Sequence, residues 1–357
     1  MTSTPTPAPP LPIAYETSPD GPRLLSECRS SVRPALAAAV GRLHPWVGEM
    51  AAYSLGWCEA GGAPSDTGGG KGLRQALAVL GARAAGAPRG AGVTAAVAVE
   101  LVHTFSLLHD DIMDGDATRR GRPTAWKAYG TGAAVLAGDA LLALAVETVA
   151  GAPGPHVPAA VRHLSAALHD LVLGQADDLL FETRPWTGPD AVGPGEYRTM
   201  AERKTGALLG CATSLGAVLA GAPATTVASL DRAGRHLGVA FQVADDVLGV
   251  WGDPAVTGKP VHSDLRRRKK TFPVLSALGT SAGASLGRLL SGAEDLDEAG
   301  ARRAATAVEE AGGRAAALAE ARRHLAVVDA CLEEAAPAPR TAADLRALLS
   351  FLVHRDR

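Results

Sequence analysis

The sequence predicts an all-α protein that folds as one large helical domain. Alanine- and leucine-rich segments with helical spacing of their apolar residues cover most of the chain, and both residues are strong helix formers. Short clusters of glycine and proline separate these segments. Sustained apolar–polar alternation, which would indicate strands, is missing from the sequence. We therefore expect roughly ten helices joined by short loops.

Composition fits this fold class. Of the 357 residues, 47% are hydrophobic, which is enough for a sizeable core in a single large helical domain. The formal net charge of −2 gives no overall reason to expect nucleic-acid binding. The cysteines are widely spaced and form no CxxC pair; they are Cys28, Cys58, Cys211 and Cys331. Such a set is typical of reduced thiols, so we expect a cytoplasmic protein.

The chain is expected to begin with a disordered tail. Residues 1–22 are rich in Pro, Thr and Ala and cannot bury enough apolar surface to fold, so the helical domain should span residues 23–357. The N-terminus lacks the basic and apolar regions of a secretory signal. The most apolar run, Ala133–Ala150, contains Asp139 and Glu147, and we interpret it as a buried helix and not as a transmembrane segment.

Turn residues mark the expected loops. They are Glu59–Gly70, Gly151–Pro158, Arg184–Gly195, Gly252–Pro260 and Ala335–Pro339. After the last of them, Thr341 and Asp344 have the spacing of a capping box, which predicts the start of the final helix.

The first candidate functional segment is an acidic helix end. Asp110 and Asp114 stand four residues apart and share a helix face, and Asp111 borders that face. An apolar stretch precedes them, and burying such carboxylates unpaired would be costly. All-oxygen ligands suit magnesium, and the following Arg119 and Arg120 suit phosphate oxygens. The simpler interpretation of this motif alone is a solvated acidic helix end beside a basic turn.

A second acidic cluster strengthens the magnesium interpretation. Asp245 and Asp246 again end an apolar helix, far along the chain, three residues after Gln242. Two such helices facing each other would hold metal ions on both sides of one diphosphate and stabilise a departing pyrophosphate.

Three basic clusters could supply the counter-charge for a diphosphate. Gly68–Arg74 is a glycine-rich loop with Lys71 and Arg74 at the start of a helix, where an anion is favoured, and it is not a P-loop. Arg203–Thr205 lies within a helix, and Gly258–Lys270 follows the second acidic cluster. A nucleic-acid patch is the alternative for Arg266–Lys270.

The order of these motifs resembles the trans-prenyltransferase (polyprenyl synthetase) family, and in particular its geranylgeranyl diphosphate synthases. The matching segments are GGGKGLR, HTFSLLHDDIMDGDATRRG, RKTG, FQVADDVLGVWGD and GKPVHSDLRRRKKTFP, and the resemblance extends from about residue 30 to the C-terminus. It implies a helical bundle of the isoprenoid synthase type with a central cavity, and a homodimer.

The resemblance also implies site residues. Metal ligands would be Asp110, Asp111, Asp114 and Asp245, with Asp246 nearby, for three Mg²⁺ ions. The allylic diphosphate would be held by Arg119, Lys204, Thr205, Gln242 and Lys259. Isopentenyl diphosphate would be held by Lys71, Arg74, His103 and Arg120. The residues implied to take part in catalysis are Asp110, Asp111, Asp114, Arg119, Lys204, Asp245 and Lys259.

The implied reaction is metal-assisted ionisation of an allylic diphosphate, attack by the double bond of isopentenyl diphosphate, and loss of a proton to the released pyrophosphate. The chain departs from the family pattern at several positions. Gly249 replaces the last aspartate of the second acidic motif, and Asp253 is a possible substitute for it. Gln75 replaces a proline, and His262 and Arg268 replace glycines.

Product length is expected to depend on the helix before Asp110. Phe105 and Ser106 lie five and four residues before it and should face the growing chain. A bulky residue followed by a small one resembles geranylgeranyl (C20) producers, with farnesyl (C15) next. Two alternatives share the implied fold: a terpene cyclase-like enzyme, which has no need of a second diphosphate site, and a non-catalytic regulatory subunit, which would be expected to lack the first acidic motif.

Overall fold

The computed structural model describes residues 20–65, 70, 72–254, 261–281, 283–292 and 296–353. The first half of the chain forms α1 (Asp20–Val40), α2 (Pro45–Ser54), α3 (Leu73–Ala84), α4 (Arg89–Met113), β1 (Thr118–Arg119), β2 (Arg122–Pro123), α5 (Ala125–Tyr129), α6 (Thr131–Ala150) and α7 (Val157–Thr183). The second half forms α8 (Pro194–Ala201), the π-helix η1 (Glu202–Gly206), α9 (Ala207–Leu219), α10 (Ala224–Trp251), α12 (Ser263–Arg266), α13 (Phe272–Leu278), α14 (Gly283–Leu290), α15 (Glu298–Glu310), α16 (Gly313–Ala335) and α17 (Pro339–Val353).

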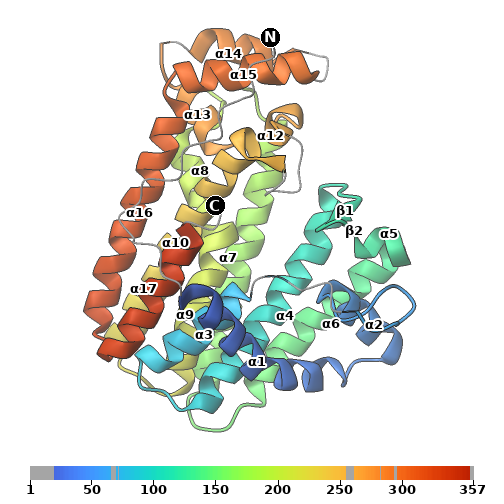
Figure 1. Ribbon diagram of the computed structural model, residues 1–357, viewed down its shortest axis with the longest axis vertical. Coiled ribbons are helices and arrows are strands. Elements are labelled where there is room, and N and C mark those ends of the chain that lie inside the picture. Colours follow the sequence, from blue (N-terminus) through green and yellow to red (C-terminus); the bar gives the residue numbers. More distant parts are fainter. Residues whose placement is uncertain are drawn as a thin grey trace.

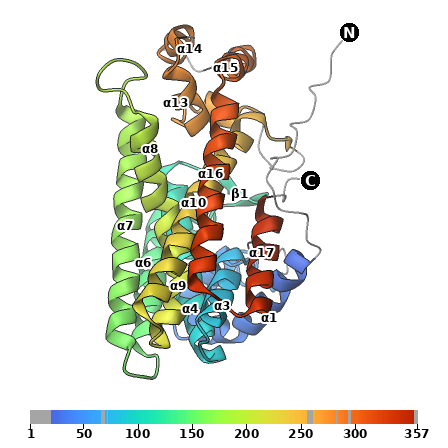
Figure 2. The same ribbon diagram turned by 90° about the vertical axis from the view of Figure 1, so that its left-hand side faces the viewer.

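The long helices form one bundle. In Figure 1, α4, α7, α10 and α16 run along the long axis, α1 lies across one end, and α14 and α15 cover the other. Figure 2 shows α7 on one side of the bundle and α17 beside α1 on the other. Extensive contacts join α10 to α9 and α16, α4 to α6, and α3 to both α4 and α9. The predicted all-α fold is confirmed, and the one pair of strands in the described residues is the short hairpin β1–β2.

Tight packing at the centre depends on small residues. A Cβ atom on Gly81 of α3 would lie 2.0 Å from the Thr213 carbonyl oxygen of α9. One on Gly234 of α10 would lie 2.3 Å from the Leu209 carbonyl oxygen. Neither space admits a side chain, so glycine at these positions brings α9 close to both neighbours and makes it almost fully buried.

Several expected boundaries shift. Helix α1 begins at Asp20, inside the range assigned to the tail, because Arg23 binds the Asp20 and Glu27 carboxylates and stabilises the first turns. The predicted capping box at Thr341 is wrong, because α17 begins two residues earlier at Pro339, and proline is well suited to the first helical position.

The apolar helix α6 is buried on one face only, so the prediction of a buried helix holds in part. Val135 and Leu136 are exposed. By length and hydropathy alone, α4 from residue 90 and α6 could each cross a membrane. In an apolar 18-residue stretch of each helix, 67% of α4 and 39% of α6 is buried within the bundle.

Candidate active site

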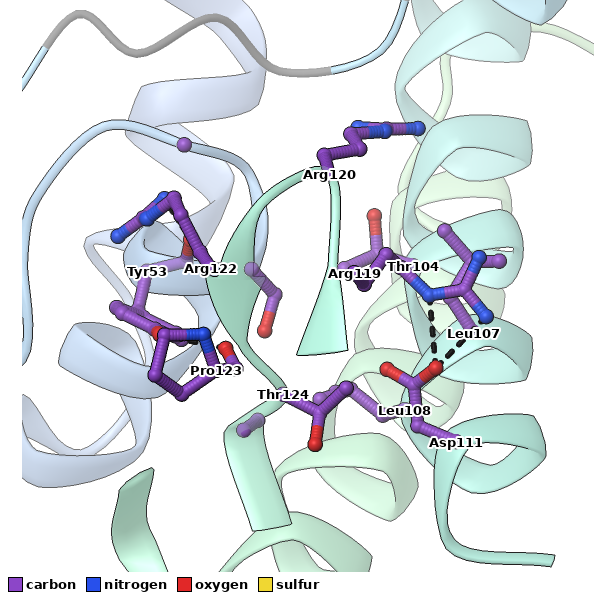
Figure 3. A pocket seen from close by; sticks show the side chains of 13 residues that line it. Tyr53, Thr104, Leu107, Leu108, Asp111, Arg119, Arg120, Arg122, Pro123 and Thr124 are labelled. Carbon is purple, nitrogen blue, oxygen red and sulfur yellow. Dashed lines mark hydrogen bonds and ion pairs between the residues drawn. The ribbon is translucent and has the colours of Figure 1, made fainter. Parts of the chain in front are cut away.

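The three aspartates at the end of α4 differ in how deeply they are buried. Asp110 and Asp114 are half-buried, whereas the Asp111 carboxylate is buried and accepts a bond from Arg119 Nε at 2.7 Å (Figure 3). Burial raises the pKa of Asp110 to about 6, opposed by Lys204 and reinforced by Asp114. Burial therefore opposes the ionisation of Asp110, and at Asp111 the bond from Arg119 opposes the same effect of burial.

Lys204 and Thr205 lie on the π-helix η1, which interrupts the helix running from α8 into α9. Such single-turn π-helices are often found at functional sites. Lys204 Nζ donates to Asp178 Oδ2 of α7 at 2.5 Å, and Arg203 Nη1 donates to Asp177 Oδ2 at 3.2 Å. The turn fits between its neighbours because a Cβ on Gly174 of α7 would lie only 2.2 Å from the Lys204 nitrogen.

The second acidic helix, α10, contributes a hydrogen-bonded chain. Thr205 Oγ1 donates to Gln242 Oε1 at 2.9 Å, and Gln242 Nε2 donates to Asp246 Oδ1 at 3.3 Å. Asp246 Oδ2 accepts from the Tyr197 hydroxyl at 2.5 Å and from the Phe272 amide at 2.8 Å.

Because both of its oxygens are engaged by protein donors, Asp246 anchors α10 to α8 and α13. Burial raises the pKa of this carboxyl to about 7, although the bonds from Tyr197 and Phe272 oppose the rise. The structure gives no support to the expectation that Asp246 contacts a metal, and Asp245, half-buried one residue earlier, stays the predicted ligand.

A second cationic pocket lies beside α1, α3 and α4. Arg74 and His103 are in contact, with 3.2 Å between Arg74 Nη1 and His103 Nε2. Burial lowers the pKa of His103 well below its ordinary value, and Arg74 lowers it further, so the ring is a neutral acceptor for the guanidinium. A cavity of about 360 Å³ is lined by His103, Arg120, Arg29 and Arg33, among others.

Lys71 and Lys259, predicted to bind the two diphosphates, lie outside the described residues. The chain-length candidates lie on α4 before the first acidic motif. Phe105 is buried and its ring meets the His109 ring edge-on, with 4.9 Å between centroids. Ser106 donates its hydroxyl to the His103 carbonyl oxygen at 3.0 Å.

The donor set suits magnesium. The half-buried carboxylates at the two helix ends offer only oxygen ligands, the kind that Mg²⁺ prefers. Within the described ranges, no group of three or more His, Cys, Asp or Glu side chains is close enough to hold an ion alone. Mg²⁺ commonly uses one or two carboxylates and completes its shell with water and substrate phosphates.

Basic residues after α12 reach across to the first acidic motif. Arg267 pairs with Asp116, and Lys269 Nζ lies 3.8 Å from Asp114 Oδ2. The basic run therefore faces the acidic helix end within the same chain. This placement favours a role beside the acidic site over the alternative of a nucleic-acid patch.

Sequence reasoning missed two acidic residues of the site. Asp178 accepts a hydrogen bond from Lys204. Glu100 is buried beside the cationic pocket, and burial raises its pKa, while the charge of Arg74 and a hydrogen bond with Gln75 oppose that rise. Each is a carboxylate in the middle of an apolar helical stretch, which is the signal that could have identified it.

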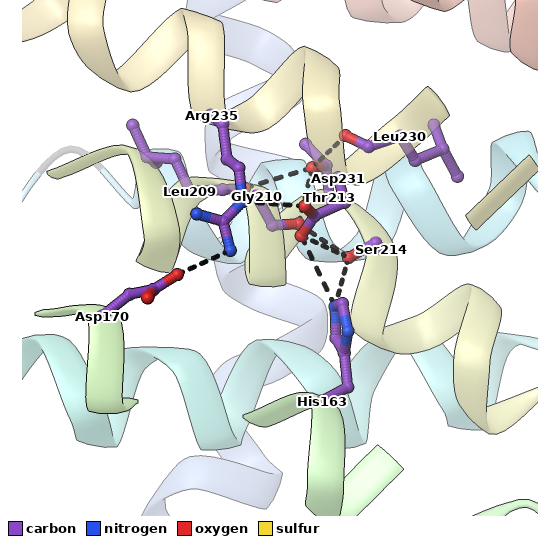
Figure 4. Close-up of polar contacts among 9 residues, drawn as sticks. All are labelled: His163, Asp170, Leu209, Gly210, Thr213, Ser214, Leu230, Asp231 and Arg235. Carbon is purple, nitrogen blue, oxygen red and sulfur yellow. Dashed lines mark hydrogen bonds and ion pairs between the residues drawn. The ribbon is translucent and has the colours of Figure 1, made fainter. Parts of the chain in front are cut away.

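A Ser/His/Asp cluster that the sequence did not suggest joins α7, α9 and α10 (Figure 4). His163 Nε2 lies 2.7 Å from Ser214 Oγ and 3.6 Å from Asp231 Oδ1. Arg235 bridges Asp231 at 2.8 Å and Asp170 at 2.9 Å. The same imidazole nitrogen faces both serine and aspartate, whereas a nucleophilic triad uses opposite ring nitrogens. The cluster therefore ties helices together.

Comparisons with known proteins show the family of the chain. A family model described as polyprenyl synthetase matches residues 65–311. A (2E,6E)-farnesyl diphosphate synthase of Mycobacterium tuberculosis is 44% identical over 336 residues, which cover 91% of this chain and 90% of that protein. A geranylgeranyl diphosphate synthase of the same species is 41% identical over 339 residues, 94% of each chain. A crystal structure of a polyprenyl synthetase from Streptomyces coelicolor superposes with a TM-score of 0.87 at 45% identity, covering 93% of this chain and 99% of that one.

Proposed function

Because the chain belongs to the polyprenyl synthetase family and is a trans-prenyltransferase, we propose that it condenses isopentenyl diphosphate with allylic diphosphates to give geranylgeranyl diphosphate (C20). The observation that carries this proposal is that cationic side chains gather at two separate places, which we propose as two anion sites, one for each diphosphate. One lies between the acidic ends of α4 and α10 beside Lys204, and the other is the cavity lined by His103 and Arg120.

When bound, Mg²⁺ would supply Lewis-acid stabilisation of the negative charge on a departing pyrophosphate. Asp110, Asp114 and Asp245 would hold the ions, three per site. Lys204, held by Asp178, and Arg119, held by Asp111, supply fixed positive charge toward the allylic diphosphate. Arg74 and Arg120 would orient isopentenyl diphosphate, so that its double bond faces the allylic carbon.

The named relatives include both farnesyl and geranylgeranyl diphosphate synthases, so they do not choose between C15 and C20. Support for C20 therefore comes from residues of this chain. Phe105 is buried on α4 before the first acidic motif, where its ring would limit the length of the growing chain, and the small Ser106 beside it would leave room for a chain longer than C15.

A terpene cyclase on the same fold has no need of the second anion site, whose Arg74–His103 contact is present here. The first acidic motif is intact, which opposes the regulatory-subunit alternative. The protein is further proposed to act in the cytoplasm as a homodimer. Apolar side chains exposed on the neighbouring helices α6 and α7 support the dimer; they are Val135, Leu136, Val172, Leu173 and Leu180.

The test is incubation of the purified protein with Mg²⁺, isopentenyl diphosphate and each of the C5, C10 and C15 allylic diphosphates, followed by mass spectrometry of the hydrolysed products. A C20 alcohol as end product is expected. A C15 or a longer end product would keep the reaction and overturn the C20 assignment, while no condensation with any primer would overturn the proposed function.

A further inference from the structure

Helix α1 contributes two cations to the second cationic pocket. Arg29 and Arg33 stand four residues apart and share a helix face, and both line the cavity of about 360 Å³ that also contains His103 and Arg120. Helix α1 precedes residue 65, where the match to the family model begins. Among the described residues that line the cavity, the one carboxylate is Glu100. The cavity therefore carries an excess of positive charge, to which α1 contributes.

An aromatic ring fixes the guanidinium of Arg33. Its Cζ lies 4.0 Å from the centroid of the Trp57 ring, which follows α2 and lines the same cavity. Stacking on a ring holds a guanidinium in place and leaves its N–H groups able to donate to phosphate oxygens. Arg33 forms no ion pair with a carboxylate in the described part of the chain, so its charge is available to a ligand.

Arg29 lies beside the start of α3. The backbone of Gly72 is left-handed (φ 72°), and a Cβ atom built there would lie 3.7 Å from Arg29 Cβ and 3.8 Å from Arg29 Cδ. The stem of Arg29 therefore packs beside the turn that begins α3. The N-terminus of a helix favours anions, and Arg29 adds a full positive charge near the same place.

A buried acceptor lies close to that stem. Gln75 is 6% exposed and lines the cavity, and the Cβ atom built on Gly72 would also lie 4.0 Å from Gln75 Oε1. This oxygen has no hydrogen-bond partner among the described residues, although the side chain has a hydrogen bond with Glu100. An unpaired buried acceptor costs free energy, so a donor is expected to reach it. A guanidinium has five N–H donors, so one can bond to Gln75 Oε1 while others face a phosphate.

We infer that Arg29 and Arg33 bind the diphosphate of isopentenyl diphosphate, and that Gln75 positions Arg29 for this contact. The inference rests on the proposed function and assigns α1 to the second anion site. Gln75 stands where the family pattern has proline, which has no side-chain acceptor. The support for Arg29 is therefore a feature of this chain.

The simpler role of the two arginines is to keep an exposed helix face solvated, with Arg33 packing on Trp57 for stability alone. Arg29→Gln and Arg33→Gln separate the two roles, because each removes one charge from the cavity and only a binding role predicts an effect confined to one substrate. Arg303→Gln is the matched control, an exposed arginine on α15 at the other end of the bundle (Figure 1).

The experiment measures the steady-state kinetics of condensation, with KM determined separately for isopentenyl diphosphate and for the allylic diphosphate, and thermal melting as the check on folding. Arg29→Gln and Arg33→Gln are each expected to raise the KM for isopentenyl diphosphate about 10-fold, as for the loss of a charge-assisted hydrogen bond. The KM for the allylic diphosphate and the melting temperature should stay unchanged. Arg33→Lys should recover part of the loss, because lysine keeps the charge without the planar fork. Arg303→Gln should change neither KM.

Gln75→Met tests the positioning role, because methionine is unbranched and has no amide acceptor. Since it also loses the bond to Glu100, it is combined with each arginine variant in a double-mutant cycle. If Gln75 acts through Arg29, adding Gln75→Met to Arg29→Gln should raise the KM for isopentenyl diphosphate by less than about twofold, whereas its effect should multiply with that of Arg33→Gln. Multiplied effects in both pairs would overturn the positioning role.

An unchanged KM for isopentenyl diphosphate in Arg29→Gln or Arg33→Gln would overturn the binding role of that arginine, and an equal rise for both substrates would overturn both roles. A wild-type protein that forms no condensation product with any allylic primer would instead overturn the proposed function on which the inference rests.

Discussion

Asp245 and Asp246 are neighbours in sequence with different surroundings. Asp246 is buried and its oxygens accept bonds from Tyr197, Phe272 and Gln242, whereas Asp245 is half-buried at the site. The acidic pair was identified from the sequence, but the division of roles depends on Tyr197, which lies on another helix and has no sequence signature of its own.

Phe105 is the residue at which product length can be tested. Phe105→Ala removes a buried ring, so products longer than C20 are expected, with the total rate lowered less than about tenfold because no charged group at the site changes. The measurement is mass spectrometry of the hydrolysed products. Val99→Ala, a buried substitution farther from Asp110 on the same helix, is the control and should leave the product unchanged.

Between elements, the close approach of α7 to η1 determines where Lys204 lies. The glycine-rich contacts that permit this approach were not foreseen from the sequence, because a glycine inside a helix has the same appearance whether it faces solvent or a neighbouring backbone. The π-helix could not be predicted either, because the composition of Arg203–Thr205 also fits a regular α-helix.

Gly174→Ala tests this contact. The added methyl would lie 2.2 Å from the Lys204 nitrogen, so we expect a loss of about 1–3 kcal/mol or more in the free energy of unfolding, together with lower activity. Denaturant unfolding measures the first and a condensation assay the second. Gly132→Ala in α6, where a Cβ has no neighbour within 4 Å, should be neutral or slightly stabilising. Equal stability of the two variants would contradict the packing argument.

The contact between α10 and α16 gives the protein an acid-sensitive point. The Nδ1 atoms of His236 and His324 are 2.7 Å apart, and burial together with His236 lowers the pKa of His324 from 6.5 to about 4. The pKa of Glu320 is held at about 2 because bonds from Arg198 and Arg323 outweigh the effect of burial.

Both depressed pKa values make the folded state bind fewer protons than the unfolded chain in acid. For His324, the unfolded chain takes up a proton below pH 6.5 while the folded state resists it down to about pH 4, so the free energy of unfolding falls as the pH falls through this window. A pKa lowered from 6.5 to about 4 corresponds to at most about 3.5 kcal/mol of the free energy of unfolding. Denaturant unfolding across this pH range should show a smaller slope in His324→Gln, whereas His169→Gln, an exposed change, should keep the wild-type slope.

On the scale of the whole molecule, the fold class could be predicted because helical periodicity and turn residues repeat along the entire chain. The motifs also located the two acidic helix ends and the pocket lined by His103 and Arg120, with Arg74 in contact with His103. What the sequence could not give were pairings between distant residues, such as Lys204 with Asp178 and Arg33 with Trp57, because these depend on how helices pack.

The exposed apolar face of α6 and α7 leads to a prediction for the assembly. Leu180 is 56% exposed, and Leu173, seven residues earlier, lies on the same side of α7. If the proposed dimer forms through this face, Leu180→Glu should raise its dissociation constant at least about 100-fold, because a charge would be buried in the interface. Sedimentation equilibrium measures the change, and Thr306→Glu on α15 is the control. A wild-type monomer would contradict the proposed dimer.

The π-helix η1 also has a consequence for how the chain can change over time. A turn of this kind contains one residue more than an α-helical turn, so the faces of α8 and α9 are offset by roughly 100° relative to an uninterrupted helix. Loss of a single codon within 202–206 would leave a longer, regular helix but would rotate everything on one side of the deletion. Substitutions can therefore accumulate throughout α8 and α9 one at a time, whereas the length of this turn is fixed for as long as Lys204 must reach the site.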